Sequence, residues 1–223
     1  MFSVLFEVRP RSEEWNTYLD SAKMLKPELE QIAGFVDNIR YRSITRDGWI
    51  LSLSNWRDEK ALVRWHTRAR HHEVQAKGRD RILGDYHLRV GQVTADNDLP
   101  AGQQLQEQRL DETETGVGTA VTLLNLTKPR DQVKAASAED CAAWFGFDPE
   151  TVGLVDWDVF DAVLTPGQLI LVATWRDHPA AERFRIARTV PAGTRVREVR
   201  VVRDYGMVDR YEAPQYYPEI SKD

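Results

Sequence analysis

The feature that most constrains the fold is an internal repeat, in which residues 48–65 (GWILSLSNWRDEKALVRW) resemble residues 167–184 (GQLILVATWRDHPAAERF). The two segments lie 119 positions apart, and the same offset aligns further identical residues without a gap. Nine identities in one register over about 30 positions indicate two copies of one unit. The identical pairs are Gly34/Gly153, Val36/Val155, Asp37/Asp156, Gly48/Gly167, Trp56/Trp175, Arg57/Arg176, Asp58/Asp177, Ala61/Ala180 and Arg64/Arg183.

The length of the chain agrees with two units joined by a linker. Its 223 residues suffice for two domains of about 100 residues, each of which can bury a core. A polar stretch with few large apolar residues, Thr94–Gly116, separates the two copies. We therefore place the first unit at residues 1–95, the linker at 96–117, the second unit at 118–205 and a tail at 206–223.

Apolar periodicity predicts the element order β-α-β-β-α-β in the first copy, which is the ferredoxin-like unit. Pro27 is expected to kink or divide the first helix. Gly48 is expected to occupy a left-handed turn position in a hairpin, and Asp58 to cap the second helix. We expect strands at 3–8, 35–44, 49–56 and 86–93, and helices from Ser12 to Ile32 and from Asp58 to Lys77.

The second copy repeats this order with weaker patterns. A single unit leaves one face of its sheet without helices, whereas two units can face each other and close their edges into a barrel. The predicted fold is therefore α+β, with two ferredoxin-like units in tandem that form a pseudo-symmetric dimeric α/β barrel within one chain. We expect its strands at 119–126, 155–164, 169–175 and 196–202, and its helices near 132–144 and 177–188.

Composition excludes several classes of protein. The net charge is −5, and neither half has the basic excess that nucleic-acid binding requires. No apolar run approaches the roughly 18 residues that span a bilayer, and the N-terminus lacks a signal-peptide pattern. Cys141 is the only cysteine, so neither an intrachain disulfide nor a multi-cysteine metal site can form. We expect a cytoplasmic protein without a metal site.

Four segments of the first copy resemble the antibiotic biosynthesis monooxygenase (ABM) domain family. The likeness covers nearly all of residues 2–94 and is weaker over 118–205. The resemblance implies a dimeric α/β barrel, and the fold hosts cofactor-free quinone-forming oxygenases, haem-degrading oxygenases and proteins of unknown role. The segments are GFVDNIRYRS (34–43), SLSNWRDEKALVRW (52–65), HHEVQAKGR (71–79) and DYHLRVGQV (85–93).

Whether this chain resembles the haem-degrading branch of the family can be tested residue by residue. Its members carry an Asn on the first strand, a Trp on the second helix and a haem-ligating His about ten residues after that Trp. Neither copy has all three, so the resemblance favours an enzyme without haem. The first copy has Glu7, Trp65 and Gln75 at these places, and the second has Asn125, Phe184 and Thr194.

Three residues of the first copy are candidates for catalysis. His72 lies seven residues after Trp65, so an unbroken helix puts both on one face, where His72 can act as a general base. Trp65 is either a core residue or the wall of an aromatic cavity, and Arg79 can stabilise an anion. The alternative for the helix around His71 and His72 is a solvated basic face.

The candidates for substrate binding are also in the first copy. Asn38 and Tyr41 lie three apart on one strand, so at most one of them can line a given cavity. The second copy lacks histidine near 189–191, and we therefore predict the ligand cavity in the N-terminal unit. The candidate substrate-binding residues are Asn38, Tyr41, Gln75, His87 and Arg89.

These observations lead to two functional hypotheses. The first is a monooxygenase that acts on a small aromatic or phenolic substrate without a tightly bound cofactor, in which a base removes a proton and the anion reacts with dioxygen. The second is a protein of the same fold that binds a small molecule without turnover or serves as a scaffold. In either case the expected partner is a small aromatic molecule, and a further homodimer of the tandem chain is left open.

Overall fold

The computed structural model describes residues 1–187 and 190–214. The first half of the chain supplies four strands and three helices, with one-turn helices at Ser12–Glu14 and Gly78–Ile82. The second half supplies four further strands and three helices, and its pattern of alternating strands and helices follows that of the first. The elements are β1 (Phe2–Pro10), α1 (Trp15–Glu30), β2 (Phe35–Ser43), β3 (Ile50–Trp56), α2 (Glu59–His66), α3 (Ala69–Lys77), β4 (Leu83–Asp96), β5 (Ala120–Thr127), α4 (Arg130–Ala135), α5 (Ala138–Trp144), β6 (Leu154–Ala162), β7 (Gln168–Trp175), α6 (His178–Ala187) and β8 (Arg195–Gly206).

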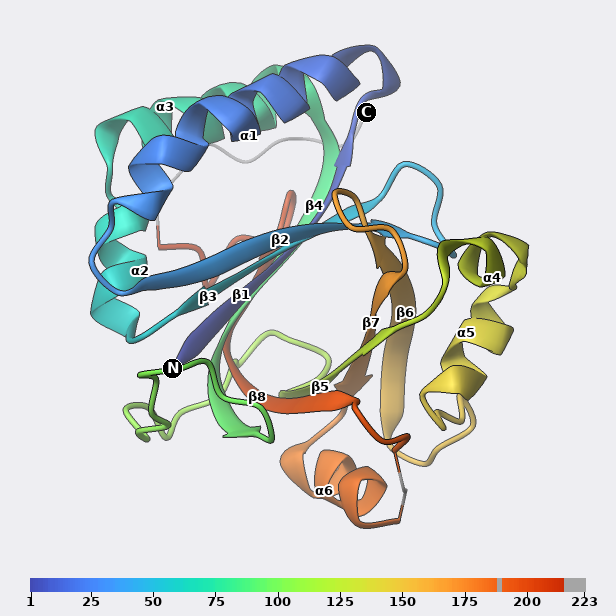
Figure 1. Ribbon diagram of the computed structural model, residues 1–223. Helices are drawn as coiled ribbons and strands as arrows, with labels where there is room; N and C mark the ends of the chain where they lie inside the picture. The colour runs from blue at the N-terminus through green and yellow to red at the C-terminus, as the bar shows by residue number, and fades with distance from the viewer. Residues whose placement is uncertain (188–189, 215–223) are drawn as a thin grey trace.

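The eight strands form one closed antiparallel barrel in the order β1-β3-β2-β6-β7-β5-β8-β4. Each half contributes four consecutive strands, and the halves meet at β2–β6 and at β4–β8 (Figure 1). The first seam is short, from Tyr41 opposite Ala162 to Ser43 opposite Phe160, whereas the second runs from His87 to Asp96. The predicted pseudo-dimeric barrel within one chain is confirmed.

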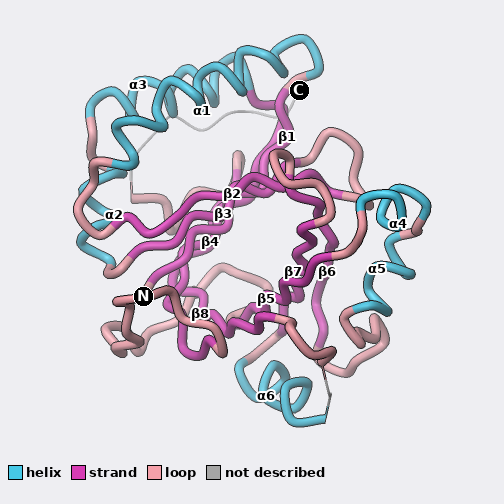
Figure 2. The backbone as a smooth tube through the Cα atoms, in the orientation of Figure 1, coloured by secondary structure: helices cyan, strands magenta, loops and turns pink. Residues whose placement is uncertain are grey.

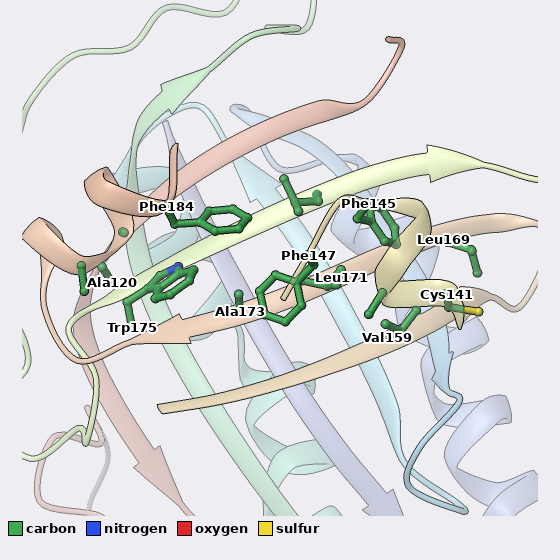
Figure 3. Close-up of a cluster of buried hydrophobic side chains, with 14 of the residues drawn as sticks. Ala120, Cys141, Phe145, Phe147, Val159, Leu169, Leu171, Ala173, Trp175 and Phe184 are labelled. Atoms are coloured by element: carbon green, nitrogen blue, oxygen red, sulfur yellow. The ribbon is translucent and has the colours of Figure 1, made fainter. Parts of the chain in front are cut away.

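The helices lie outside the ring of strands, with α1–α3 on the first half and α4–α6 on the second (Figure 2). Side chains therefore alternate between a barrel interior and a face covered by helices. The interior core includes Leu5, Leu53 and Val199. The outer core of the second half includes Phe147, Trp175 and Phe184 (Figure 3).

The repeated identities have a structural reason. Gly34 and Gly153 have φ values of 97° and 93°, which L side chains rarely adopt. A Cβ on either glycine would lie 2.7 or 2.6 Å from the Cβ of Ala61 or Ala180, so the helix can approach only because both residues are small. The paired glycines and alanines thus fix the same helix-to-strand approach in both halves.

The repeated WRD segment fixes the helix in this close position. Arg57 donates its backbone N–H to Gly34 O at 2.8 Å, and Asp58 accepts the N–H of Ala61 at 2.8 Å, which caps α2 as predicted. Trp56 and Trp175 are fully buried, and each indole N–H has a hydroxyl partner on its own half of the chain. Gly48, at φ 75°, takes the expected left-handed turn.

Three expectations about helices need correction. Of the two effects expected of Pro27, a kink or a division of the first helix, the division is wrong, because α1 continues through Pro27 from Trp15 to Glu30. The helix expected near 132–144 is two helices, because a capping box at Ser137 starts α5 anew. The helix expected from Asp58 to Lys77 is also two, since α2 ends at His66 and α3 begins at Ala69. Arg188, the expected end of the last helix, and residues 215–223 of the tail lie outside the described residues.

Strand pairing defines which residues of the two halves correspond. Phe2 pairs with Trp56, and Ala120 pairs with Trp175, so the first strands correspond with an offset of 118 instead of 119. In this register Glu7 of β1 corresponds to Asn125 of β5. Leu5 pairs with Arg89 and Leu123 with Arg197, so these two arginines also occupy equivalent places.

Candidate functional site

A cavity of about 330 Å³ lies between α6 and the outer face of β8, and we call it the α6 cavity. Its wall is mixed, with apolar side chains from α6 and β8 beside a few polar ones. Cavities of this size hold small organic molecules. The lining residues are Ala95, Asp96, Asn97, Phe184, Arg185, Val190, Val196 and Glu198.

Glu198 is the unusual residue of the α6 cavity, because its carboxyl group is almost completely buried, with the residue 4% exposed. The hydroxyl of Thr122 donates to Oε2 at 2.9 Å, and Oε1 has no hydrogen-bond partner among the described residues. Burial raises the pKa of Glu198 to about 7, although the hydrogen bond from Thr122 and the positive charge of Arg185 both act to lower it. A carboxyl group with this pKa can both accept and donate a proton at neutral pH.

Aromatic packing fixes the helix that covers this cavity. Phe184 of α6 is 2% exposed, and its ring lies 5.0 Å from the indole of Trp175 and 5.7 Å from the ring of Phe147 (Figure 3). Asp177 caps the start of α6 by accepting the N–H of Ala180 at 2.8 Å. The repeat motif therefore fixes α6 against β7 and β5, and Glu198 of the neighbouring β8 lines the preformed space beside Phe184.

The structure places the candidate histidines differently from the prediction. The prediction that His72 shares the face of Trp65 is wrong, because the break between α2 and α3 changes the direction of the second helix. His72 is exposed, whereas His71 stacks on Trp65 with the ring centroids 4.3 Å apart. Trp65 itself is buried in the outer core of the first half with Trp56 and Val90.

The remaining candidates near this helix form no common site. Gln75 Nε2 lies 3.3 Å from Nδ1 of His66, and Arg79 is buried in the one-turn helix that follows α3. Asn38 donates to Ser52 Oγ at 3.2 Å on the helix-covered face of the sheet, and Tyr41 packs in the barrel interior. The expectation that Asn38 and Tyr41 point to opposite faces is therefore confirmed.

His87 and Arg89 both lie on the inner face of β4. His87 Nε2 is 2.5 Å from Oδ1 of Asp204 on β8. Arg89 is 3% exposed and donates to Glu7 and, at 2.6 Å, to Thr174 Oγ1 of the second half. This arginine is therefore part of a buried ion pair instead of a cavity rim.

A second cavity, of about 230 Å³, lies inside the barrel where β5 ends and β8 begins, and we call it the barrel-mouth cavity. Tyr41 is the one predicted binding residue that lines it. Arg197 lines it as well and donates to Asn125 Oδ1 at 2.7 Å and to Asn55 Oδ1 at 3.2 Å. The other lining residues are Asp37, Ile39, Leu53, Asp98, Leu126, Thr127, Gln168, Leu169, Gly193 and Arg195.

The prediction that the functional cavity lies in the N-terminal unit is wrong for the larger of these two cavities. In the first half Val90 occupies the place of Glu198, and it packs against Trp65 in the outer core. The space that is open beside Phe184 is therefore filled beside Trp65. The sequence patterns did not identify Arg197 and Glu198 as candidates, which are buried charged neighbours on a strand whose other charged residues are only partly buried.

The described part of the chain shows neither a cluster of metal ligands nor a helix that could span a membrane. No group of three or more His, Cys, Asp or Glu side chains within residues 1–187 and 190–214 is arranged to hold a metal ion. None of the described helices combines the length and apolar composition that crossing a bilayer takes. Cys141 is buried, and burial raises the pKa of its thiol.

Comparison with known proteins gives the family. The model of the antibiotic biosynthesis monooxygenase family matches residues 1–77. The jasmonate monooxygenase ABM of Pyricularia oryzae (strain 70-15 / ATCC MYA-4617 / FGSC 8958) is 48% identical over 225 residues, which cover 99% of this chain and 100% of that protein. The chain belongs to the antibiotic biosynthesis monooxygenase family.

Solved structures support the fold of this family member. An aldoxime dehydratase superposes with a TM-score of 0.52 at 12% identity, covering 91% of this chain and 81% of its own. An aldoxime dehydratase in complex with butyraldoxime gives a TM-score of 0.51 at 12% identity, covering 91% and 79%. At this identity the likeness shows a shared fold, and it assigns no activity to the chain.

Proposed function

We propose that this chain is a monooxygenase that oxidises a small, mostly apolar organic acid of the jasmonate class in the α6 cavity, with Glu198 as the group that transfers the proton. The observation that carries the proposal is a buried carboxyl group with a pKa of about 7 that faces a preformed cavity. Family membership and the name of the 48% identical relative support the reaction and the substrate class.

The substrate class proposed here differs from the phenolic one that the first-copy residues suggested. Jasmonate is a small alicyclic ketone with a carboxylate and an apolar chain. The α6 cavity suits such a molecule, because Phe184, Val190 and Val196 offer apolar contacts and Arg185 is exposed at its edge. Phenols remain a useful comparison substrate, since a phenol also loses a proton before it reacts with dioxygen.

The chemistry sets what the site must supply. When a CH₂ group becomes a carbonyl, the balance is R₂CH₂ + O₂ → R₂C=O + H₂O, and the substrate provides all four electrons. When the product is an alcohol, a second reductant must provide two electrons, for which NAD(P)H is the natural first choice to test. In both cases a proton leaves the substrate and water is formed, and Glu198 is placed to take and return that proton.

We also propose that the reaction needs no tightly bound haem or metal. The support is the residue set, since Gln75 and Thr194 stand where the haem-degrading branch of the family has its ligand. The visible absorption spectrum and metal analysis of the purified chain test this directly. A coloured preparation, or activity that is lost with a chelator and restored by a metal, contradicts it.

The decisive experiment measures oxygen uptake and ¹⁸O incorporation with jasmonate, with and without NAD(P)H. Wild-type protein should give a labelled product, and its rate should rise with pH through about 7 as Glu198 loses its proton. Glu198→Gln should reduce the rate by about 100-fold or more. Glu139→Gln, an exposed glutamate on α5, is the matched control and should leave the rate unchanged.

Two outcomes separate the alternatives. Jasmonate binding without oxygen uptake under all conditions supports the non-catalytic binding protein instead of the enzyme. Turnover of phenols but not of jasmonate supports the proposed monooxygenase activity and contradicts the proposed substrate class. If Glu198→Gln leaves turnover unaltered, the reaction does not take place in the α6 cavity.

A further inference from the structure

Each half of the barrel has one buried arginine on its last strand, and the two arginines have different partners. Arg89 and Arg197 occupy equivalent places on β4 and β8, and each reaches across the barrel to a polar side chain of the other half, Thr174 or Asn55. Both are almost completely buried, with exposures of 3% and 2%. A buried guanidinium needs a counter-charge, because taking it out of water costs several kcal/mol, roughly.

Only the first of these arginines has a counter-charge bonded to it. Glu7 forms an ion pair with Arg89, whereas Asn125 stands at the equivalent place beside Arg197 and offers only an amide oxygen. No carboxylate within the described parts of the chain forms an ion pair with Arg197. The sequence has therefore replaced an anion with a neutral group of similar size at one end of a pseudo-symmetric barrel.

Two of the nearby carboxylates, Asp37 and Asp96, are engaged by other groups, and Asp98 is exposed at the edge of the cavity. Asp37 accepts the amide N–H of Asn55 at 2.6 Å, and Asp96 accepts two hydrogen bonds from Arg195 at 3.0 and 2.7 Å. Burial lowers the pKa of Arg197, and Arg195 repels the cation more strongly than either carboxylate attracts it. The cationic form of Arg197 is thus favoured by any further anion that reaches it.

Among the described residues, the two ends of the barrel differ in the space beside the arginine. At the Arg89 end, Arg46 forms an ion pair with Glu7, and Nε of Arg46 also donates to Oδ2 of Asp158 at 2.8 Å. Protein side chains therefore occupy this end of the barrel. At the Arg197 end the barrel-mouth cavity of about 230 Å³ borders Arg197, Asn125 and Tyr41. This volume is below the range of pockets for drug-sized ligands and suits a small organic acid.

We propose that the barrel-mouth cavity is a binding site for a small monocarboxylate, whose carboxylate group takes, beside Arg197, the place that Glu7 has beside Arg89. A single negative charge balances the single unpaired guanidinium, and a planar carboxylate matches the guanidinium edge. A dianion such as phosphate is disfavoured, because Asp37 and Asp98 line the same cavity. The site lies on the inner face of β8, and the α6 cavity lies on its outer face.

Isothermal titration calorimetry tests the site with acetate, butanoate, jasmonate, the methyl ester of jasmonate and inorganic phosphate. The wild type should bind the carboxylates, and should bind neither the ester nor phosphate comparably. Binding of acetate and butanoate identifies a general carboxylate site, whereas jasmonate binding is assigned to this cavity only where Asn125→Glu weakens it, because the α6 cavity is also proposed to bind jasmonate. No carboxylate binding up to about 50 mM, which corresponds to a very weak site, overturns the proposal.

The key variant is Asn125→Glu, which installs beside Arg197 the carboxylate that Glu7 provides beside Arg89. It should raise the Kd for carboxylates at least tenfold while leaving the thermal midpoint unchanged or higher, so lost binding cannot be attributed to unfolding. Arg197→Gln is a second variant with the same expected loss. Asn125→Glu protein that binds carboxylates like the wild type overturns the site.

The test is independent of the proposed reaction. Glu198→Gln, on the other face of β8, should retain carboxylate binding whether or not turnover is lost. Failure of the α6-cavity chemistry therefore leaves the barrel-mouth result intact, and failure to bind acetate and butanoate, which are not the proposed substrates, overturns the barrel-mouth site but leaves the chemistry intact.

Discussion

The imidazole of His71 stacks on the indole of Trp65, with the ring centroids 4.3 Å apart and the planes inclined by 21°. Nδ1 of His71 lies 3.2 Å from the carbonyl oxygen of Trp65. Burial and the neighbouring His66 lower the pKa of His71 to about 4. The folded protein therefore holds a neutral imidazole here at neutral pH, as a packing group between α2 and α3.

This stack predicts a loss of stability in acid. The pKa of His71 is about 4 in the folded chain and near 6.5 when unfolded, so the unfolded chain binds more protons as pH falls from 6.5 to 4. The free energy of unfolding should therefore decrease over that window. His71→Phe keeps the stack without the titration, and its thermal midpoint should fall less between about pH 7.5 and about pH 5 than that of the wild type.

His72→Phe is the control for this prediction, because His72 is exposed on the next position of the same helix. Its midpoint should follow the wild-type pH dependence. An equal pH dependence for His71→Phe and the wild type would show that His71 titrates normally in the folded chain.

The sequence predicted a histidine beside Trp65 but selected His72, whereas the structure places His71 there. A helix turns 100° per residue, so an unbroken helix brings His72 to the face of Trp65. The real chain ends α2 at His66, where Thr67 Oγ1 donates to Val63 O at 2.9 Å, and restarts at Ala69. Neither glycine nor proline marks this break, so periodicity alone could not detect it.

The Glu198 carboxyl predicts the opposite pH dependence. Its pKa is about 7 in the folded chain against 4.5 in the unfolded chain, so the folded state binds more protons between pH 4.5 and 7. The wild type should lose stability as pH rises through that window, by roughly 3 kcal/mol for the full shift. Glu198→Gln removes this cost, and denaturant unfolding should show it more stable than the wild type at about pH 8 and similar near pH 4.5.

A contradictory result is easy to recognise. If Glu198→Gln is no more stable than the wild type at alkaline pH, the carboxylate is well solvated or paired in the folded chain. The observed Thr122 hydrogen bond alone does not provide such pairing, because it satisfies only one of the two carboxyl oxygens.

The sequence predicted the barrel better than the site for a physical reason. The glycine, alanine and WRD positions that build each half are identical in both copies, so their register could be read directly. The first and last strands of the two copies correspond with different offsets. An ungapped alignment of the copies therefore matched Glu198 with Arg79, whereas the strand pairing shows that Val90 is its equivalent in the first half. The residue that distinguishes the two outer faces was therefore compared with the wrong partner.

The buried ion pairs of the first half predict a large effect of Glu7→Gln. Glu7 is 5% exposed and pairs with both Arg89 and Arg46, and these cations keep the pKa of Glu7 low despite its burial. Removing the carboxylate leaves Arg89 buried without its anion, which should lower the free energy of unfolding by about 3 to 5 kcal/mol. Denaturant titration at neutral pH measures this change.

Glu59→Gln is the matched control, since Glu59 pairs with Arg109 where both side chains are about a quarter exposed. Surface pairs contribute roughly 0 to 1 kcal/mol, so this variant should lose little stability. A similar loss for both variants would mean that Arg89 gains water or another anion when Glu7 is removed.

The β4–β8 seam predicts that Gly91 tolerates no side chain. A Cβ at Gly91 would lie 2.3 Å from Cγ1 of Val199 and 2.7 Å from the carbonyl oxygen of Arg200, and the second contact is with backbone. Gly91→Ala must therefore separate the strands that close the barrel and should lower the free energy of unfolding by about 1 to 3 kcal/mol or more. Gly78→Ala is the control, because a Cβ there comes no closer than 3.7 Å to Leu83, and it should remain near wild-type stability. Equal stabilities of the two variants in denaturant unfolding would show that the seam can relax, and that closure of the barrel does not depend on this contact.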